Sequence, residues 1–310
     1  MRALFVGLGS IGNRHSINLR NICQERKTPL HITALRSHLG SLKDDKFEQI
    51  DEMITSLGSE KYDIAFITNP TILHLETFEK IKNSAEFFFV EKPIFGDTRK
   101  TPQEIGMSDK NTYIAAPMRF CQTYVKLKEL LQKKKVFSSR ILCSSYLPDW
   151  RPKQDYRKTY SAQKELGGGV SIDLIHEIDY MVDLFGFAQC YHTLNGQYSN
   201  LEIDSNDLSI TIAKYENMLC EVHLDYFGRT YRRTCECFCD DGTIIADFGE
   251  SIITLTNGSI IDCKEDLNIR YLRELEYFLD FTQSKKNNVN PPSLAFKTLK
   301  IALGESQNNE

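Results

Sequence analysis

The residues best suited to chemistry begin with a lysine that follows an apolar run. In Glu91-Lys92-Pro93, the ammonium group of Lys92 comes directly after residues 87–90, a run typical of a buried strand. In a crevice poor in water, a lysine can donate a hydrogen bond to a substrate hydroxyl and stabilise the alkoxide that forms as hydride leaves carbon. Lysines at strand ends are also commonly solvated, so Lys92 alone leaves both interpretations open.

A second segment combines carboxylates with an imidazole. After Gly167-Gly-Gly169, the residues Asp173, His176 and Asp179 stand at i, i+3 and i+6, beside an apolar stripe. On one helix they would share an edge. His176 could then exchange a proton near neutral pH, with a carboxylate one turn away to fix its tautomer. The alternative is an ordinary helix start whose acids complement the dipole.

A glycine-rich segment offers a place for a dinucleotide. Gly7, Gly9 and Gly12 separate an apolar run at 3–6 from a helix-compatible run at 11–19. Gly7 permits a tight turn, Gly9 lets the backbone approach a pyrophosphate, and Gly12 lets the helix pack closely on the strand. The helix N–H groups and its positive dipole end would face the anion, unless the segment is an ordinary βα turn. The predicted contacts of this loop are Gly7, Gly9, Ser10, Ile11 and Gly12.

The next two strand ends bear on the type of cofactor. In such folds the second strand usually ends in an acid that binds the adenosine 2′-hydroxyl, whereas residues 31–35 are followed by Arg36 and Ser37. Because an arginine fork pairs well with phosphate oxygens, NADP(H) is favoured over NAD(H). If Arg36 is instead a surface residue that stacks on adenine, either cofactor could fit. Thr68-Asn-Pro70, at the third strand end, would contact the ribose or nicotinamide side, or form a plain turn.

These groups need elements to position them. Alternating strands and helices over the first 120 residues predict an α/β fold with a doubly wound parallel sheet. The strands are expected at 3–6, 31–35, 64–68, 87–90 and 113–116, and the helices from residue 11 and at 47–57 and 73–82. The sequence therefore predicts a Rossmann dinucleotide-binding domain at residues 1–120.

Beyond residue 118 the pattern changes. A helix at 124–134 and a strand at 140–146 precede the glycine-opened helix, and strand-like runs joined by short turns then follow one another. Such runs predict a mostly antiparallel sheet. The strands are expected at 191–198, 208–215, 219–227, 233–239, 243–247 and 252–256, and two final helices at 272–284 and 294–303. Residues 121–310 are thus predicted to form an α+β domain for substrate binding and oligomerisation.

A loop rich in aromatic and basic residues leads into the glycine-opened helix. Its Trp150, Arg151 and Tyr156 are predicted to bind substrate, since aromatic faces stack on sugar C–H surfaces and arginines pair with carboxylates or phosphates. The alternative is that Trp150 anchors the loop by packing. A second basic group is expected at a turn between strands. Its side chains would be solvated, or would bind a substrate anion or form part of a contact between subunits. It comprises Arg229, Arg232 and Arg233, around Tyr231.

Composition narrows the class of protein. The 310 residues are 41% hydrophobic with a net charge of −4 and both signs interspersed, which predicts a folded, soluble chain that does not bind nucleic acid. No apolar run is long enough for a membrane span, and the first strand starts too near Met1 for a signal peptide, so a cytoplasmic location is expected. The nine cysteines are then expected as thiols. Among them, Cys235, Cys237 and Cys239 occupy every second position, so they would lie on one face of a strand as small apolar residues. This spacing differs from the C-x2-C spacing of zinc ligands.

Together these motifs resemble the Gfo/Idh/MocA oxidoreductases, a family of NAD(P)-dependent sugar and polyol dehydrogenases and reductases. The resemblance covers most of the chain and implies that Lys92, Asp173 and His176 line an active site beside the nicotinamide. It rests on the glycine loop followed by Arg14-His15, Thr68-Asn69-Pro70 with His74, Glu91-Lys92-Pro93, Arg119-Phe120, and the helix bearing Asp173 and His176. The cofactor contacts that it implies are Thr68, Asn69, Pro70, His74, Glu91, Lys92 and Arg119.

One departure from the family pattern concerns the histidine. Many members place it four residues after the aspartate, and here the interval is three. Both spacings keep the pair on one helix face, but the departure leaves open whether Asp173 or Asp179 orients His176.

The resemblance also implies a reaction, in which hydride moves between a nicotinamide cofactor and a hydroxyl or keto carbon of a sugar or sugar derivative, with no metal needed. The Leu-Pro-x-Trp-x-Pro form of the loop is similar to that of members in surface-polysaccharide or acidic-sugar metabolism. Substrate contacts would come from Lys92, Trp150, Arg151, Tyr156, Asp173 and His176. Two alternatives are a non-catalytic dinucleotide sensor and a lyase or glycosidase that uses its nicotinamide transiently. A homodimer or homotetramer through the C-terminal sheet is implied as well.

Overall fold

The protein is described by a computed structural model that covers residues 1–36 and 47–305. It divides into two compact units, one made of residues 1–116 and 271–296 and the other of residues 117–270 with the chain from 297 onward. Each unit is therefore built from two separate stretches of the chain, whereas the sequence led us to expect a single boundary near residue 120.

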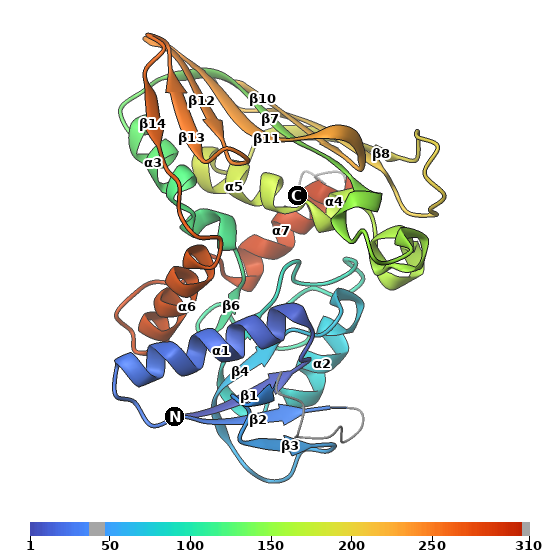
Figure 1. Cartoon of the computed structure of the whole chain (residues 1–310), viewed down its shortest axis with the longest axis vertical. Helices are drawn as coiled ribbons and strands as arrows, with labels where there is room; N and C mark the ends of the chain where they lie inside the picture. Colours follow the sequence, from blue (N-terminus) through green and yellow to red (C-terminus); the bar gives the residue numbers. More distant parts are fainter. Residues whose placement is uncertain (37–46, 306–310) are drawn as a thin grey trace. The chain divides into compact units, whose positions relative to one another are not determined.

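The first unit contains a six-stranded sheet in the spatial order β3-β2-β1-β4-β5-β6 (Figure 1). All neighbouring strands are parallel, as the sequence predicts. Because the order runs outwards from β1 and β4, the carboxyl ends of these two strands flank the point where such sheets place their ligands. The bounds are β1 Arg2–Val6, β2 His31–Leu35, β3 Glu52–Ile54, β4 Tyr62–Ile67, β5 Ala85–Val90 and β6 Thr112–Ile114.

A helix from the far end of the sequence completes this unit. In α6, the fully buried Glu274 accepts hydrogen bonds from the Tyr113 hydroxyl (2.9 Å) and the Ala116 N–H (2.5 Å). Phe278 packs against Phe89 with 5.3 Å between ring centroids. These contacts explain why residues 271–296 return to the first unit. The helices are α1 Ser10–Glu25, α2 His74–Ile81, α6 Ile269–Thr282 and α7 Pro292–Leu303, the last of which continues into the second unit.

The helix predicted at 47–57 is wrong. Residues 52–54 instead form the edge strand β3, which pairs in parallel with β2. The Asp51 carboxylate accepts hydrogen bonds from the Ile32 N–H (2.7 Å) and the Arg20 side chain (2.6 Å), which fixes the start of the strand. The apolar spacing of the segment suits a helix, but pairing with the edge of β2 overrides this weak local preference.

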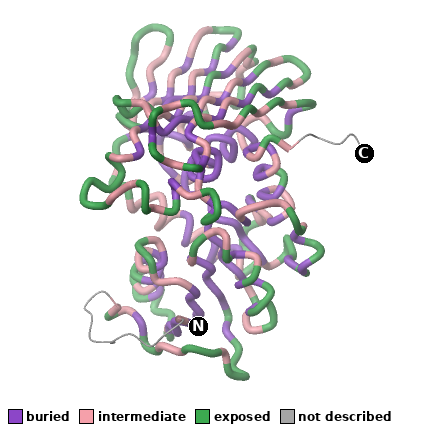
Figure 2. The backbone as a smooth tube through the Cα atoms, turned by 90° about the vertical axis from the view of Figure 1, so that its right-hand side faces the viewer, coloured by how far each residue is buried: buried purple, intermediate pink, exposed green. Residues whose placement is uncertain are grey.

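The second unit contains an eight-stranded sheet in the order β14-β13-β12-β11-β7-β10-β9-β8 (Figure 1). Strands β7 and β10 are parallel and the other neighbours antiparallel, so the predicted mostly antiparallel sheet is confirmed. Along β7 and β10, buried residues alternate with half-buried or exposed ones, a pattern that can be followed in the tube of Figure 2. The buried Cys235, Cys237 and Cys239 lie on the inner face as free thiols. The bounds are β7 Val136–Tyr146, β8 Cys190–Gly196, β9 Leu208–Lys214, β10 Leu219–Asp225, β11 Phe227–Cys239, β12 Gly242–Asp247, β13 Ile252–Leu255 and β14 Ile260–Asp262.

The continuous helix expected after Gly169 is also wrong. Leu174 leaves the helical conformation (φ −98°, ψ 28°), so Asp173 ends one helix and His176 begins the next. Asp173 and His176 are therefore separated by a turn instead of sharing one helix edge. The helices of this unit are α3 Gln122–Leu131, α4 Val170–Asp173 and α5 His176–Phe185. Across the residues that the structure describes, no helix is long and apolar enough to cross a membrane.

The basic group expected at a turn lies on a strand. The Asp225 carboxylate accepts hydrogen bonds from the N–H groups of Phe227 (3.1 Å) and Gly228 (2.7 Å), which closes a very short connection between β10 and β11. The arginines at 229, 232 and 233 consequently belong to β11, whose register against β7 shifts between Phe227 and Arg232. The segment is thus an irregular strand where we expected a hairpin turn.

Candidate functional site

The glycine loop between β1 and α1 is closed on one side and open on the other. Gly7 has φ +100°, and a Cβ there would lie 2.5 Å from the Asn69 nitrogen. A Cβ on Gly12 would clash with the Gly7 carbonyl oxygen and lie 2.7 Å from Oγ1 of Thr68. At Gly9, by contrast, a Cβ would have no heavy atom of the described chain within 4 Å. The loop therefore offers room for a ligand at Gly9, where the backbone is best able to approach a phosphate.

Helix α1 adds a favourable potential at this open side. It begins at Ser10, directly after Gly9, and no acidic residue stands in its first turn. Within the described residues, no side chain caps its first N–H groups. A helix start of this kind attracts anions through its N–H groups and its dipole. The loop and the helix together fit the pyrophosphate of a dinucleotide.

The loop after β4 faces the glycine loop. Oγ1 of Thr68 donates a hydrogen bond to the Gly7 carbonyl oxygen (2.6 Å), and Nδ2 of Asn69 donates to Oγ1 of Thr77 (2.7 Å). Oδ1 of Asn69 is buried and lacks a hydrogen-bond partner within the described chain. Since buried amide oxygens are usually satisfied, this atom is the one in the loop best placed to receive a donor from a ligand. Pro70 follows immediately, before α2.

His74 connects two predicted cofactor segments. Its Nε2 lies 2.9 Å from the Asn69 carbonyl oxygen and its Nδ1 lies 3.0 Å from that of Pro93. Burial lowers the pKa of His74 even though these hydrogen bonds act in the opposite direction. A neutral imidazole carries one N–H, so it can donate to one of the two carbonyls at a time. His74 thus joins the loop after β4 to the segment that follows Lys92.

Lys92 follows β5, as expected, and its neighbour Glu91 is fixed from α1. Oε1 of Glu91 lies 2.7 Å from Nε2 of the fully buried His15, and Oε2 accepts the backbone N–H of Lys92 at 3.2 Å. The His15 ring packs edge-on against Phe89 with 4.9 Å between centroids. Burial would raise the pKa of Glu91, but the His15 hydrogen bond and the charges of His15 and Lys92 outweigh it and lower the pKa. Glu91 therefore connects the glycine-loop helix to the backbone of Lys92.

This lowered pKa predicts a pH dependence of stability. A carboxyl group whose pKa is lower in the folded chain contributes stability above its usual value of about 4.5, and the contribution is lost as the pH falls through the folded value. We expect the free energy of unfolding to fall between pH 5.5 and 3.5 more steeply in the wild type than in Glu91→Gln. Urea titrations at several pH values measure the difference. Equal slopes in the two proteins would contradict the role assigned to the His15–Glu91 pair.

Arg36 lies at the carboxyl end of β2, as predicted. Its N–H donates to the Ile54 carbonyl oxygen (2.9 Å), and its guanidinium lies over the ring of Phe47, 5.2 Å from the centroid. Nη1 is 3.9 Å from the sulfur of Met53. The guanidinium is therefore half-buried against apolar groups at a strand end. Ser37, the other residue predicted here, lies outside the described residues.

In the second unit, the predicted acid Asp173 is largely buried. Its Oδ2 accepts a hydrogen bond of 2.6 Å from the hydroxyl of Tyr226. Charge and hydrogen bonding from Asp173 add to burial in raising the pKa of Tyr160. His176 opens α5 and is half-buried. The chain thus brings two tyrosines to Asp173, and no sequence motif predicts this role for either of them.

The other acid of the predicted edge, Asp179, has a different partner. Arg119 donates two hydrogen bonds to its carboxylate, at 2.9 and 2.7 Å, and a third to Asp183 at 3.1 Å. All three residues belong to the second unit, and Arg119 is buried there. Arg119 therefore has a structural role in an ion-pair network, while its cofactor contact remains a prediction.

Three of the residues predicted to bind substrate, Trp150, Arg151 and Tyr156, line a small pocket in the loop after β7. Nε1 of Trp150 donates to Oγ of Ser145 (3.1 Å), and the Trp150 ring packs edge-on against Tyr226 with 5.2 Å between centroids. Trp150 nevertheless keeps 38% of its surface exposed, so anchoring the loop leaves part of the ring accessible. The lining residues are Leu147, Trp150, Arg151, Tyr156, Thr159 and Ser161.

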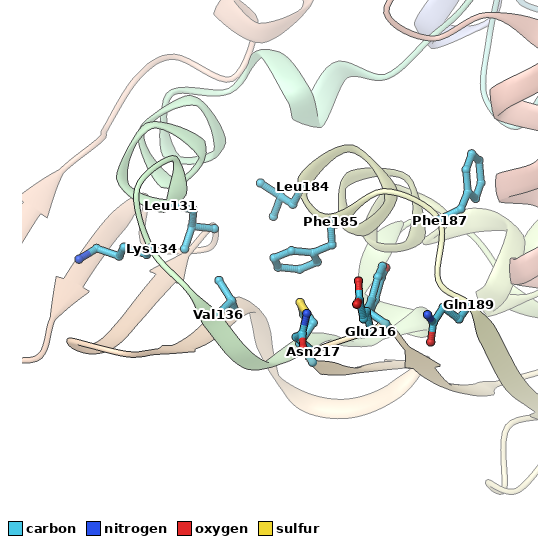
Figure 3. Close-up of a pocket in the computed structure, with 11 residues that line it drawn as sticks. Leu131, Lys134, Val136, Leu184, Phe185, Phe187, Gln189, Glu216 and Asn217 are labelled. Atoms are coloured by element: carbon cyan, nitrogen blue, oxygen red, sulfur yellow. The ribbon is translucent and has the colours of Figure 1, made fainter.

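A larger pocket of the second unit lies elsewhere (Figure 3). It has a volume of about 520 Å³ and is formed by the ends of α3 and α5 with the turn between β9 and β10. Phe185, Leu184 and Val136 supply apolar walls, and Glu216 and Gln189 lie at its polar side. None of the residues predicted to be functional lines it.

One buried ion pair was not predicted. Glu177 is fully buried in α5, and Arg233 of β11 donates to both of its oxygens, at 2.7 and 3.0 Å. Burial opposes the charge of Arg233, but the carboxylate of Glu177 raises the pKa of the guanidinium well above its usual value. Sequence alone gives no sign of this pair, because Glu177 and Arg233 lie 56 residues apart on different elements.

Comparisons with known proteins find similar structures but no similar sequences. No protein-family model matches the chain, and no curated protein sequence does. The myo-inositol 2-dehydrogenase of Lactobacillus plantarum is 17% identical with a TM-score of 0.74, and the match covers 98% of this chain and 95% of that one. A levoglucosan dehydrogenase solved with NADH and levoglucosan is 13% identical with a TM-score of 0.79 and the same coverage. The WlbA dehydrogenase of Bordetella pertussis, solved with NADH and UDP-GlcNAcA, is 12% identical with a TM-score of 0.74, covering 98% and 94%.

At these identities the likeness concerns the fold. A match over 98% of the chain includes both the parallel six-stranded sheet and the larger, mostly antiparallel one. The chain therefore has the same two-domain fold as these dehydrogenases, which is the fold that the resemblance in its sequence predicts.

Proposed function

We propose that the protein is an NAD(P)-dependent oxidoreductase that acts on a hydroxyl or keto carbon of a sugar or sugar derivative. The observation that carries this proposal is the glycine loop, which is closed by close packing at Gly7 and Gly12 and open at Gly9. When bound, the nicotinamide supplies or accepts the hydride. The names of the dehydrogenases with a similar fold, which act on inositol and levoglucosan, support a sugar as the other reactant.

Three side chains are proposed to act on the substrate. In the oxidation direction, Lys92 donates a hydrogen bond to the developing alkoxide and His176 accepts the hydroxyl proton. Asp173 orients the imidazole. Asp179 is the weaker candidate for that task because Arg119 donates to both of its oxygens.

The class of sugar follows from the loop after β7. Trp150 offers an exposed aromatic surface for sugar C–H groups, and Arg151 a cation for a carboxylate or phosphate. We therefore propose an acidic or nucleotide-linked sugar, of the kind used in surface-polysaccharide metabolism. The ligand named for the WlbA dehydrogenase, UDP-GlcNAcA, supports this choice by analogy.

The test is a substrate panel of neutral sugars, acidic sugars and sugar nucleotides with NAD(H) and NADP(H), followed by absorbance of the reduced nicotinamide. A substrate-dependent change in absorbance is expected for at least one acidic member. Tight cofactor binding without any change would instead identify a non-catalytic sensor. Product formation without net cofactor change would identify a lyase or glycosidase that uses its nicotinamide transiently.

The preference for NADP(H) is tested at Arg36. Since hydrogen bonds to charged groups contribute about 1.5–3 kcal/mol, Arg36→Ala should weaken NADP(H) binding about tenfold or more and leave NAD(H) binding within about twofold. Fluorescence titration measures both affinities. Arg26→Ala serves as the control. It removes a guanidinium at the C-terminal end of α1, the end away from the glycine loop, where Arg26 pairs with Asp280 at 3.0 Å. An equal loss for both cofactors would contradict the assignment.

We also propose that the outer face of the larger sheet forms a homodimer or homotetramer contact. Leu194, Ile212 and Phe238 point to that face and are 72%, 43% and 37% exposed. Burial of such side chains between subunits is favourable. Sedimentation equilibrium gives the assembly mass, and a monomer at micromolar concentration would refute this proposal.

A further inference from the structure

The environment of Asp173 contains more than the predicted acid and imidazole. Tyr226 lies in the connection between β10 and β11 and is fully buried. Its backbone is held on both sides, because its N–H donates to the Asp207 carbonyl oxygen (3.0 Å) and its own carbonyl accepts from the Leu147 N–H (2.9 Å). The hydroxyl then reaches Oδ2 of Asp173 at 2.6 Å. A short hydrogen bond to a carboxylate from so fixed a residue restricts the position of the carboxylate.

Two further contacts fix the ring and the acid. The edge of Trp150 packs against the Tyr226 ring at an interplanar angle of 89°. Tyr160, from the same loop as Trp150, also hydrogen-bonds with Asp173. Burial and the charge of Asp173 raise the pKa of Tyr226 well above its usual value, so the hydroxyl remains a donor at all ordinary pH values. Two neutral tyrosine hydroxyls, those of Tyr226 and Tyr160, are therefore directed to the Asp173 side chain.

We propose that Tyr226 is a positioning residue that holds the Asp173 side chain in a fixed position as an acceptor for the imidazole of His176. The inference rests on the proposed function, in which His176 takes the substrate proton. Tyr226 itself contacts neither the reacting carbon nor the cofactor in this scheme. It acts through Asp173, and the loop residue Trp150 supports it from the side.

The activity test is Tyr226→Phe, which removes the hydroxyl and keeps the ring that packs on Trp150. We expect kcat to fall about tenfold or more, because a misplaced general base loses much of its effect, while the KM for the cofactor stays within about twofold. In an Asp173→Asn background, Tyr226→Phe should cause no further loss. An additional loss in that background, or an unchanged kcat, would overturn the proposal.

A matched control exists in the same unit. Tyr180 is also a fully buried tyrosine, but its hydroxyl has no hydrogen-bond partner among the described residues. Tyr180→Phe removes a buried hydroxyl without affecting Asp173, so it should leave kcat unchanged. If both variants lowered kcat alike, a general packing effect would replace the positioning role.

A second measurement does not depend on turnover. The second measurement is a double-mutant cycle of urea unfolding with Tyr226→Phe and Asp173→Asn. The effect of the double substitution on the unfolding equilibrium constant should be about tenfold smaller than the product of the two single effects. Strict multiplicativity would show that the hydrogen bond is absent and would refute the inference directly. If no sugar supports turnover but the cycle shows coupling, the proposed reaction fails while the Tyr226–Asp173 contact stands.

Discussion

Replacing Lys92 by methionine should lower turnover by about a thousandfold and leave cofactor affinity within about twofold. Methionine has a similar length but cannot donate a hydrogen bond to the developing alkoxide, and such donors and proton-transfer groups each contribute about 10²- to 10⁴-fold. His176→Asn should have an effect of the same order, because asparagine cannot accept the substrate proton. Since both residues act on one reaction, the double variant should be little worse than either single variant.

The measurement combines steady-state rates with titration of the reduced cofactor by fluorescence. Lys61→Met is a suitable control, because Lys61 is a lysine of the first unit whose Nζ donates to the Asn83 carbonyl oxygen (2.6 Å). Its turnover should equal that of the wild type. Substantial activity in Lys92→Met would show that another group polarises the substrate, and a large loss of cofactor affinity would assign Lys92 to binding.

The largest expected effect on stability comes from Arg233. Arg233→Met leaves Glu177, a fully buried carboxylate, without the guanidinium that donates to both of its oxygens. Removing one partner of a buried ion pair typically costs about 3–5 kcal/mol. We therefore expect a loss of that size in the free energy of unfolding, measured in urea.

The double variant Glu177→Leu/Arg233→Met should recover most of this loss, since apolar residues of similar volume often replace a buried pair without cost. Arg140→Met is the control, because Arg140 pairs with Glu221 and Glu236 on an exposed surface, where ion pairs contribute little. A double variant as unstable as Arg233→Met would show that cavity formation, and not the unpaired charge, dominates.

Much of the fold could be predicted because the relevant signals are local. The apolar runs of β1, β4 and β5 lie on buried parallel strands, and the glycine spacing before α1 reflects contacts made within a single βα unit. The helix predicted at 47–57 is wrong because the structure there depends on a distant strand. The apolar residues of this segment have helical spacing, but the strand β3 depends on an edge of β2 that local sequence does not reveal.

In the candidate site, too, residues in local motifs could be predicted and residues joined by long-range contacts could not. Lys92, Asp173 and His176 could be selected because they stand in short motifs beside strand or helix boundaries. Tyr226 could not, since it lies 53 residues from Asp173 and meets it only through the connection of β10 to β11. The role of Arg119 could not be predicted either, because its partners Asp179 and Asp183 lie 60 and 64 residues further along the chain.

The alternation of the two units along the chain has a consequence for synthesis on the ribosome. Domains generally fold in order as they emerge, the N-terminal one first. Here Tyr113 and Ala116 can form their hydrogen bonds to Glu274 only after α6 has been synthesised. The same holds for the packing of Phe89 against Phe278. Most strands and helices of the second unit are therefore synthesised while the six-stranded sheet of the first unit still lacks α6. The first unit thus begins the chain but is completed only by residues 271–296, and the second unit still requires the residues from 297 onward.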